Sequence, residues 1–289
     1  MSASDTPWRG RRLHFVGVAG AGMSGYARAA HALGASVTGS DRADSPHLER
    51  LRADGVLAAA HAGHAAANVP GGEDVEVIYS SAVPPENPER RAARERGLPE
   101  RPRAELLGEL SALKRTIAVA GTHGKTTTAS MLVHALRGGG LGGTGPGGTG
   151  SGADAGPGAG GRGAGGSAAD AGEVSWLVGA GVGDGLANAH WGSGDWLVIE
   201  ADESDRSMLS LEVEVAVLTN VELDHHATFA SLAEVREAFR SFLARARRAI
   251  VVWDRPELLA LAPGAGGEAE SGGGGGTAGR GAAAGEGAA

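Results

Sequence analysis

The sequence predicts an α/β fold with two parallel sheets. Short apolar runs alternate with helical patterns, and two of these runs end in glycine-rich turns at 17–22 and 121–124. Strands that are apolar throughout are buried on both faces, as in parallel sheets, where ligands collect at the carboxyl ends of the strands. Because the polar clusters of this chain follow such ends, we expect binding sites at one edge of each sheet.

The first predicted domain covers residues 1–114 and is Rossmann-like. It opens with the apolar run 13–18, a glycine turn and a helical pattern over 23–33, which together form a β-α-β beginning. The other expected elements are a strand at 35–38 that ends at Gly39-Ser40-Asp41, a helix at 46–54, a strand at 75–79 and a helix at 87–96.

The second predicted domain, 115–263, is an incomplete P-loop ATPase-type domain with a parallel sheet. Its first strand, 116–120, runs into a phosphate-loop sequence, and a helix follows through about residue 137. The other expected elements are strands at 176–178, 196–199 and 213–218, a helix at 232–247 and a strand at 249–253.

Glycine is concentrated in an insertion at 138–172 and a tail at 264–289. Both segments have almost no large apolar side chains. They therefore cannot bury enough surface to offset the entropy lost on ordering, and we predict that both are disordered.

Composition excludes several functions. The formal charge is -8 and no basic face with interleaved aromatics recurs, which argues against nucleic acid as a partner. The chain has no cysteine, which removes disulfides, thiolate metal sites and cysteine nucleophiles. No apolar run reaches the roughly 20 residues of a membrane span, and the polar start is no signal peptide. We expect a cytoplasmic protein.

The phosphate loop is the most informative motif. A strand, a glycine loop and a helix place backbone N–H groups around an anion, with a lysine for the outer phosphates and a hydroxyl for magnesium. Val119 occupies the position at which the strict pattern has its first glycine. The predicted ATP-binding residues are Gly121, Thr122, His123, Gly124, Lys125, Thr126 and Thr127.

Two further polar clusters follow strand ends. The acidic run Glu200–Asp205 suits a hard cation, and Glu200 with Thr126 suffices for one Mg²⁺, which usually keeps several waters. Asp224-His225-His226 is either a metal site or a polar loop. At most one of its histidines is expected to be a ligand.

The first glycine turn, Gly17 to Gly22, resembles a nucleotide-diphosphate cradle, and Asp41 ends the next strand, where a ribose hydroxyl can bind. The turn predicts a diphosphate more readily than it identifies the nucleotide. NAD, FAD and a UDP-sugar all remain open.

Together these motifs resemble those of the Mur ligase family over about residues 13–253. The matching blocks include Gly-Thr-His-Gly-Lys-Thr-Thr at 121–127 and Glu-Ala-Asp-Glu-Ser-Asp at 200–205, which form the most specific pair. The others are His14–Gly17 with Gly20–Gly25, Gly39–Asp41, Gly63-His64 with Asn68, Ser80–Val83 with Asn87–Glu89, Arg103–Leu107, and Thr219–Glu222 with Asp224-His225.

The resemblance implies ATP-dependent ligation of L-alanine to UDP-N-acetylmuramate through an acyl phosphate, in the synthesis of peptidoglycan precursors. It assigns Lys125, Glu200 and His225 to catalysis, with Lys125 on the outer phosphates, and Thr126, Glu200 and His225 to magnesium. It places the UDP-sugar on Gly20, Gly22, Ser24, Asp41 and Ser81.

Three features depart from the family pattern. Ala19 stands where the family usually has glycine, and it would weaken sugar-nucleotide binding only if its φ is positive. The segment 138–172 is an insertion. The glycine-rich tail stands where the family has a third domain, so we expect impaired turnover.

Other functions stay open. A ligase that attaches recycled tripeptide to the same sugar and a non-catalytic UDP-sugar-binding module are alternatives. A third hypothesis, a nicotinamide oxidoreductase, is supported by the first glycine turn alone.

Overall fold

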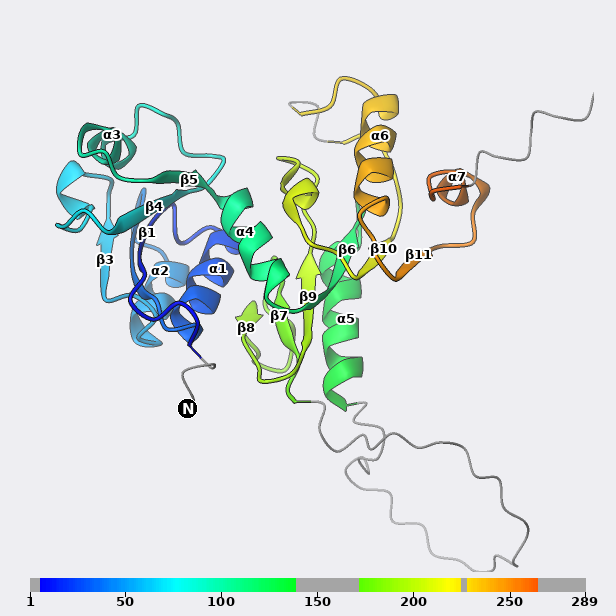
Figure 1. Cartoon of the computed structure of the whole chain (residues 1–289), viewed down its shortest axis with the longest axis horizontal. Coiled ribbons are helices and arrows are strands. Elements are labelled where there is room, and N and C mark those ends of the chain that lie inside the picture. The colour runs from blue at the N-terminus through cyan, green and yellow to red at the C-terminus, as the bar shows by residue number, and fades with distance from the viewer. Residues whose placement is uncertain (1–5, 139–171, 225–227, 265–289) are drawn as a thin grey trace, which may run out of the picture.

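The computed structural model describes residues 6–138, 172–224 and 228–264. Within these ranges the chain forms two sheets with helices packed on them, one at the left of Figure 1 and one at its centre. The predicted α/β class is confirmed. Most of the predicted insertion, 138–172, and of the predicted tail, 264–289, lies outside the described residues.

The first sheet is parallel throughout and has the strand order β3-β2-β1-β4-β5. From the central strand β1 the chain builds outward on one side, then returns to add β4 and β5 on the other. The carboxyl end of β1 is therefore a topological switch point, where ligands bind in open α/β sheets. The strands are β1 (Arg12–Val16), β2 (Ser36–Asp41), β3 (Ala59–Ala62), β4 (Val75–Tyr79) and β5 (Glu100–Pro102).

Two helices of this part, α2 and α3, begin where the sequence offers caps. The Ser45 hydroxyl accepts a hydrogen bond from Leu48 N, and the Asn87 side chain accepts from Glu89 N. Each cap is followed by a proline at the first helical turn, where no amide hydrogen is needed. The helices are α1 (Ala21–Ala32), α2 (Pro46–Ala53), η2 (Ala66–Asn68), α3 (Pro88–Glu95) and α4 (Arg103–Ala112).

The second sheet has the order β11-β10-β6-β9-β7-β8. The predicted parallel sheet is confirmed, and at one edge it carries the two-residue strand β8, which runs antiparallel to β7. The strands are β6 (Arg115–Ala120), β7 (Ser175–Leu177), β8 (Ala189–His190), β9 (Trp196–Glu200), β10 (Val215–Leu218) and β11 (Ala249–Val252). The helices are α5 (Lys125–Gly138), η4 (Ser207–Ser210), α6 (Leu232–Leu243) and α7 (Pro256–Leu259).

Several element boundaries differ from the predictions by a few residues, and for two of them the structure shows the cause. Strand β2 continues through Asp41 and does not end at 38, because Gly39 pairs with Phe15. A Cβ on Gly39 would lie 2.9 Å from the Phe15 carbonyl oxygen, so close strand packing requires glycine there. Helix α6 ends at Leu243 rather than at 247, since Arg247 N already donates to Val213 O beside β10.

Of the three apolar clusters among the described residues, the largest spans both sheets. This cluster includes Met23 of α1, Leu106 of α4 and Leu177 of β7. Helix α4 lies between the sheets in Figure 1 and carries the chain from one to the other. It packs tightly on η4, because a Cβ on Gly108 would lie 2.8 Å from the Ser210 carbonyl oxygen. The sheets are therefore held in contact.

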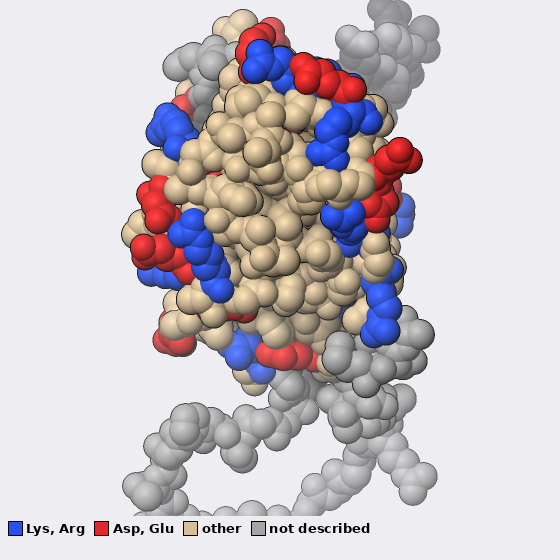
Figure 2. Space-filling view, turned by 90° about the vertical axis from the view of Figure 1, so that its left-hand side faces the viewer, with Lys and Arg blue, Asp and Glu red and all other residues tan. Residues whose placement is uncertain are grey.

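The outer face of the first domain is mixed in charge. Figure 2 shows acidic and basic side chains interspersed around an uncharged centre, without a continuous basic stripe on this face. Such a stripe is the footprint of proteins that track nucleic acid. None of the helices in the described ranges is long and apolar enough to cross a membrane.

Candidate functional site

The phosphate-loop sequence forms the turn between β6 and α5. Gly121 has φ +134° and Gly124 has φ +78°, conformations that side chains rarely adopt. A Cβ on Gly121 would also collide with the Thr219 hydroxyl. Val119, at the position where the strict motif has glycine, is buried in β6 and pairs with Glu200 of β9. The loop therefore needs its glycines only from residue 121 onward.

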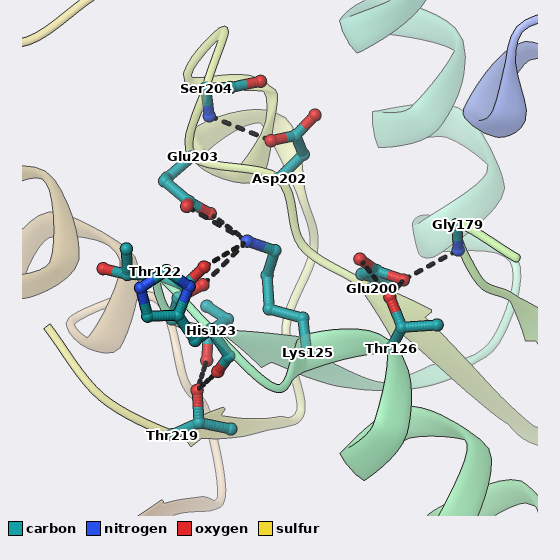
Figure 3. A network of polar contacts seen from close by, with 12 residues as sticks. Thr122, His123, Lys125, Thr126, Gly179, Glu200, Asp202, Glu203, Ser204 and Thr219 are labelled. Carbon is teal, nitrogen blue, oxygen red and sulfur yellow. Dashed lines mark hydrogen bonds and ion pairs between the residues drawn. The ribbon is translucent and has the colours of Figure 1, made fainter. Parts of the chain in front are cut away.

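Lys125 is the first residue of α5, and its amine turns back over the loop. Its Nζ donates to Gly121 O at 2.8 Å and lies 2.9 Å from Glu203 Oε2 (Figure 3). Glu203 is only 2% exposed, so this ion pair is shielded from water. The pair fixes the ammonium group above the opening of the loop, where an anion on the loop amides would meet it.

Thr126 and Glu200 lie beside Lys125. The Thr126 hydroxyl is 3.0 Å from each carboxylate oxygen of Glu200, and Gly179 N donates to Glu200 Oε2 at 2.7 Å (Figure 3). A Cβ on Gly179 would lie 3.0 Å from that oxygen, so glycine permits the approach. A hydroxyl and a carboxylate side by side offer the hard oxygen ligands that Mg²⁺ prefers.

The two residues that follow β10 support the other side of the loop. Thr219 Oγ1 donates to His123 O at 2.7 Å, and Asn220 Oδ1 accepts from His123 N at 2.9 Å. The side chains of His123 and Thr127 are exposed. His225, predicted as a ligand and catalytic residue, lies outside the described residues, as does His226. In the described ranges, no group of three or more His, Cys, Asp or Glu side chains could hold a metal ion.

Arg103 joins the acidic loop to the first domain. Its Nε donates to Asp205 at 2.7 Å and its Nη2 to Asp202 at 2.9 Å, although these residues are about a hundred positions away in the chain. Arg103 is the first residue of α4, and its guanidinium group reaches the loop that follows β9. The ion pairs therefore fix the acidic run against the first domain.

This ion-pair cluster shifts several pKa values. Burial alone would raise the pKa of Asp202 and of Asp205, but hydrogen bonds, including those from Arg103, lower both. Burial also raises the pKa of the Tyr26 hydroxyl to about 12, and the nearby Arg103 opposes this shift. Both carboxylates are therefore charged and Tyr26 is neutral at neutral pH.

The first glycine turn is fastened by the end of β2. Gly17 N and Val18 N both donate to Ser40 O at 2.9 Å, and Ala19 N donates to Asp41 Oδ2 at 2.8 Å. Ala19 is not among the described residues with positive φ, so its methyl group costs no backbone strain. The condition under which Ala19 would weaken binding is therefore not met.

Helix α1 starts at this turn without a side-chain cap. Its N-cap is Gly20, and no side chain there bonds to the first amides of the helix. An anion can satisfy such amides. Gly20, Gly22 and Asp41 lie at this one edge of the sheet, and Ser81 follows the neighbouring strand β4. They stay predicted ligands of the sugar nucleotide.

Ser24 has a different environment. It is buried, its hydroxyl donates to Ala21 O at 3.0 Å, and Asn188 Nδ2 donates to Ser24 Oγ at 3.0 Å. Asn188 also donates to Ala21 O at 2.8 Å. These bonds attach the loop before β8 to α1, so the visible contacts of Ser24 connect the two domains.

The buried carboxylate of Glu89 supports the first turn through Ser40. Glu89 is fully buried, and its oxygens accept from Ser40 Oγ at 2.5 Å, Asn68 Nδ2 at 2.6 Å and His14 Nε2 at 3.1 Å. Burial raises the pKa of Glu89, but the hydrogen bonds from His14, Ser40 and Asn68 outweigh it and lower the pKa to about 2. Glu89 thereby fixes Ser40, whose carbonyl holds the turn.

A cavity of about 370 Å³ connects the two turns. It is lined on one side by residues of α1, including Gly22 and Tyr26, and on the other by Lys125, Thr126 and Glu200. Arg103 also lines it. A ligand can thus extend from the first glycine turn to the phosphate loop.

Some site residues were missing from the sequence-based prediction. The roles of Arg103, Glu203 and Gly179 depend on contacts between segments about 20 to 100 positions apart. Arg103 and Glu203 lay within blocks quoted for the family resemblance, and that position in a motif was their only signal. Gly179 gave none.

Comparisons with known proteins identify the family of this chain. Residues 12–115 match the family described as "Mur ligase family, catalytic domain", and residues 119–271 match "Mur ligase middle domain". The UDP-N-acetylmuramate–L-alanine ligase of Delftia acidovorans is 40% identical over 255 residues, which cover 87% of this chain and 46% of that protein. The Bartonella quintana protein of the same name is 40% identical over 258 residues, covering 86% and 46%.

Solved structures show the same fold. The UDP-N-acetylmuramate–alanine ligase of Thermotoga maritima matches with a TM-score of 0.68 and 25% identity, covering 87% of this chain and 51% of that one. The UDP-N-acetylmuramate:L-alanyl-γ-D-glutamyl-meso-diaminopimelate ligase of Neisseria meningitides also gives 0.68 and 25%, covering 87% and 74%.

The described residues form an α/β fold with two sheets, in which a phosphate loop and a second glycine turn line one cavity. The chain belongs to the Mur ligase family, whose members are ATP-dependent amide-bond-forming ligases. The predicted family resemblance is confirmed. The chain spans about half the length of the curated relatives it matches.

Proposed function

We propose that this protein uses ATP and Mg²⁺ to join L-alanine to UDP-N-acetylmuramate through an acyl phosphate. The observation that carries the proposal is the convergence of Lys125, Thr126 and Glu200 at the carboxyl ends of β6 and β9. Relatives with about 40% identity are named as ligases for this pair of substrates. The proposal includes a cytoplasmic location, where ATP is available.

In this proposal the loop residues Gly121 to Thr127 bind ATP, and Lys125 contacts its outer phosphates. Positioning and charge stabilisation dominate phosphoryl transfer, because negative charge spreads over the transferred oxygens. Lys125 is held rigidly by Glu203 and Gly121 O, so its charge is oriented in advance. Glu203 restrains the ammonium group without removing it from the cavity.

The chain's own donors fit a magnesium ion. Thr126 and Glu200 would hold it, together with His225, which lies outside the described residues. When bound, the ion would neutralise charge on the phosphate oxygens. Gly179 N orients the Glu200 carboxylate through its 2.7 Å hydrogen bond.

The sugar nucleotide is proposed to bind on the first domain, 1–114. The uncapped start of α1 would hold its diphosphate, with Gly20, Gly22 and Asp41 at the turn and Ser81 beside it. The cavity then leads its carboxylate toward Lys125 in the second domain, 115–263.

Calorimetry and product analysis test the proposal. We expect the protein to bind UDP-N-acetylmuramate and, separately, ATP with Mg²⁺, and to form the alanyl product, detected by its mass. Binding of the sugar without the nucleotide would instead favour a non-catalytic UDP-sugar-binding module. An absorbance change with a nicotinamide cofactor would contradict the assignment.

A second acceptor is supported by one observation. The Neisseria ligase, whose name contains a tripeptide, matches this fold with the same TM-score as the alanine ligase of Thermotoga. Offering L-alanine and the tripeptide in competition distinguishes the two. We expect the alanyl product, because the relatives with about 40% identity carry that name.

A further inference from the structure

Arg103 lies where the two predicted binding regions meet. It lines the cavity together with Gly22 of the first turn and with Lys125 and Glu200 of the second domain. Its side chain is only 11% exposed. A charge this well shielded from water interacts more strongly with a ligand than a surface charge does.

Two aspartates hold one edge of the guanidinium. Nε donates to Asp205 and Nη2 donates to Asp202, which leaves Nη1 on the other edge. Among the described residues, no hydrogen bond joins Nη1 to a protein acceptor. A Cβ on Gly22 would lie 2.9 Å from Nη1, so this edge faces the start of α1.

The other cation of the cavity is already engaged. Lys125 and Arg103 are the basic residues among the described cavity lining, and Lys125 donates to Gly121 O and pairs with Glu203. Arg103 therefore presents the N–H groups that stand between the first turn and the phosphate loop. A carboxylate on this path can accept hydrogen bonds from them.

We propose that Arg103 binds the carboxylate of the sugar nucleotide through Nη1 and holds it between the two glycine turns. The inference rests on the proposed function, since it takes that substrate as given. Asp202 and Asp205 offset much of the positive charge, so the selectivity comes from directed hydrogen bonds more than from net attraction. A lysine at this position would keep the charge but lose the planar fork.

Two nucleotides test this role. UDP-N-acetylmuramate carries the carboxylate on a lactyl ether, and UDP-N-acetylglucosamine has the same nucleotide and sugar ring with a free hydroxyl in place of that ether. We expect calorimetry to give the wild type a roughly tenfold preference for the first, the size of one charge-assisted hydrogen bond. Arg103→Met should bind both equally, and Arg103→Lys should retain part of the preference.

Arg101→Met is the matched control. Arg101 lies two positions earlier and is also held by carboxylates, Glu76 and Glu109, but it does not line the cavity. It should keep the full preference. Thermal unfolding checks that each variant is folded. If Arg103→Met does not fold, Arg103→Lys decides the question.

Two results would overturn the role of Arg103: a wild type without preference, or a preference that survives intact in the Arg103 variants. A wild type that binds neither nucleotide would instead refute the proposed function itself.

Discussion

The two glycine turns occupy the same place in their sheets, yet they present different chemistry. The first is fastened by Ser40 O and Asp41, and its helix begins with Ala21 and Gly22. The second is fastened by Thr219 and Asn220, and its helix begins with Lys125 and Thr126.

The two turns therefore suit different tasks: the first suits binding of a group that stays unchanged, and the second suits transfer of a phosphoryl group. The first turn offers backbone amides, which suit a diphosphate that is not altered. The second adds a shielded ammonium and a hydroxyl beside a carboxylate, which suit a phosphoryl group in transfer. Changes at the second turn should therefore affect turnover, and changes at the first should affect sugar binding and stability.

Replacing the lysine should have the largest effect. We expect Lys125→Met to lower product formation by about 10³-fold or more, because it removes charge stabilisation from the transferred phosphoryl group. The affinity for UDP-N-acetylmuramate in calorimetry should stay within about twofold, since uncharged contacts of the first turn are untouched.

Lys114→Met is the control for Lys125. Lys114 bonds to the carbonyls of Gly192 and Gly194, away from the cavity. It should change stability but not turnover. Equal losses in the two variants would remove the special role of the second turn.

The stability that the buried Glu89 carboxylate contributes should be lost in acid. The pKa of Glu89 is depressed to about 2 from 4.5, so its contribution to folding is present above 4.5 and is lost as the pH falls toward 2. Denaturant titrations should find that this loss is on the order of 2–3 kcal/mol in the wild type and absent in Glu89→Gln. Parallel curves for the two proteins would contradict the account.

Removing the fastener of the first turn should have a moderate effect. Asp41→Ala leaves Ala19 N without its acceptor, which should cost about 1–2 kcal/mol of stability and weaken sugar-nucleotide binding. Asp41→Asn keeps an acceptor oxygen and should restore most of both. Nucleotide binding at the second turn should not change, and a change there would break the distinction between the turns.

The smallest effect is expected at Ala19. Because its φ is not positive, Ala19→Gly relieves no strain and only adds freedom to the unfolded chain, at a cost of roughly 0.5–1 kcal/mol. The affinity for UDP-N-acetylmuramate should not improve. Tighter binding in calorimetry would show that the methyl group crowds the ligand.

The sequence predicted the central strands of the two sheets better than the edge strands or helix α4, for which no helix was predicted. Strands β1, β4, β6 and β9 are apolar runs and stand near their predicted positions. Strands β3 and β5 went unpredicted because Ala-Ala-His-Ala and Glu-Arg-Pro lack the β-branched and aromatic residues that mark a strand. Neighbouring strands, rather than local propensity, determine these edges.

The candidate site divides in the same way. The motif residues Lys125, Thr126 and Glu200 were predicted from strand ends, and they do lie together. The partners that fix them, Glu203 and Gly179, act across the fold, and periodicity carries no information about such contacts. The roles of the site residues stay predictions, including that of His225.

Helix α4 limits how the two sheets can move apart. Along the described ranges, the polypeptide passes from one sheet to the other only through this helix, while Asn188 and Arg103 make polar attachments across the same boundary. Separating the halves needs a pivot at α4 together with loss of these attachments. Since packed interfaces switch between discrete arrangements rather than stretch, separation of the two sheets is expected to be a single concerted step.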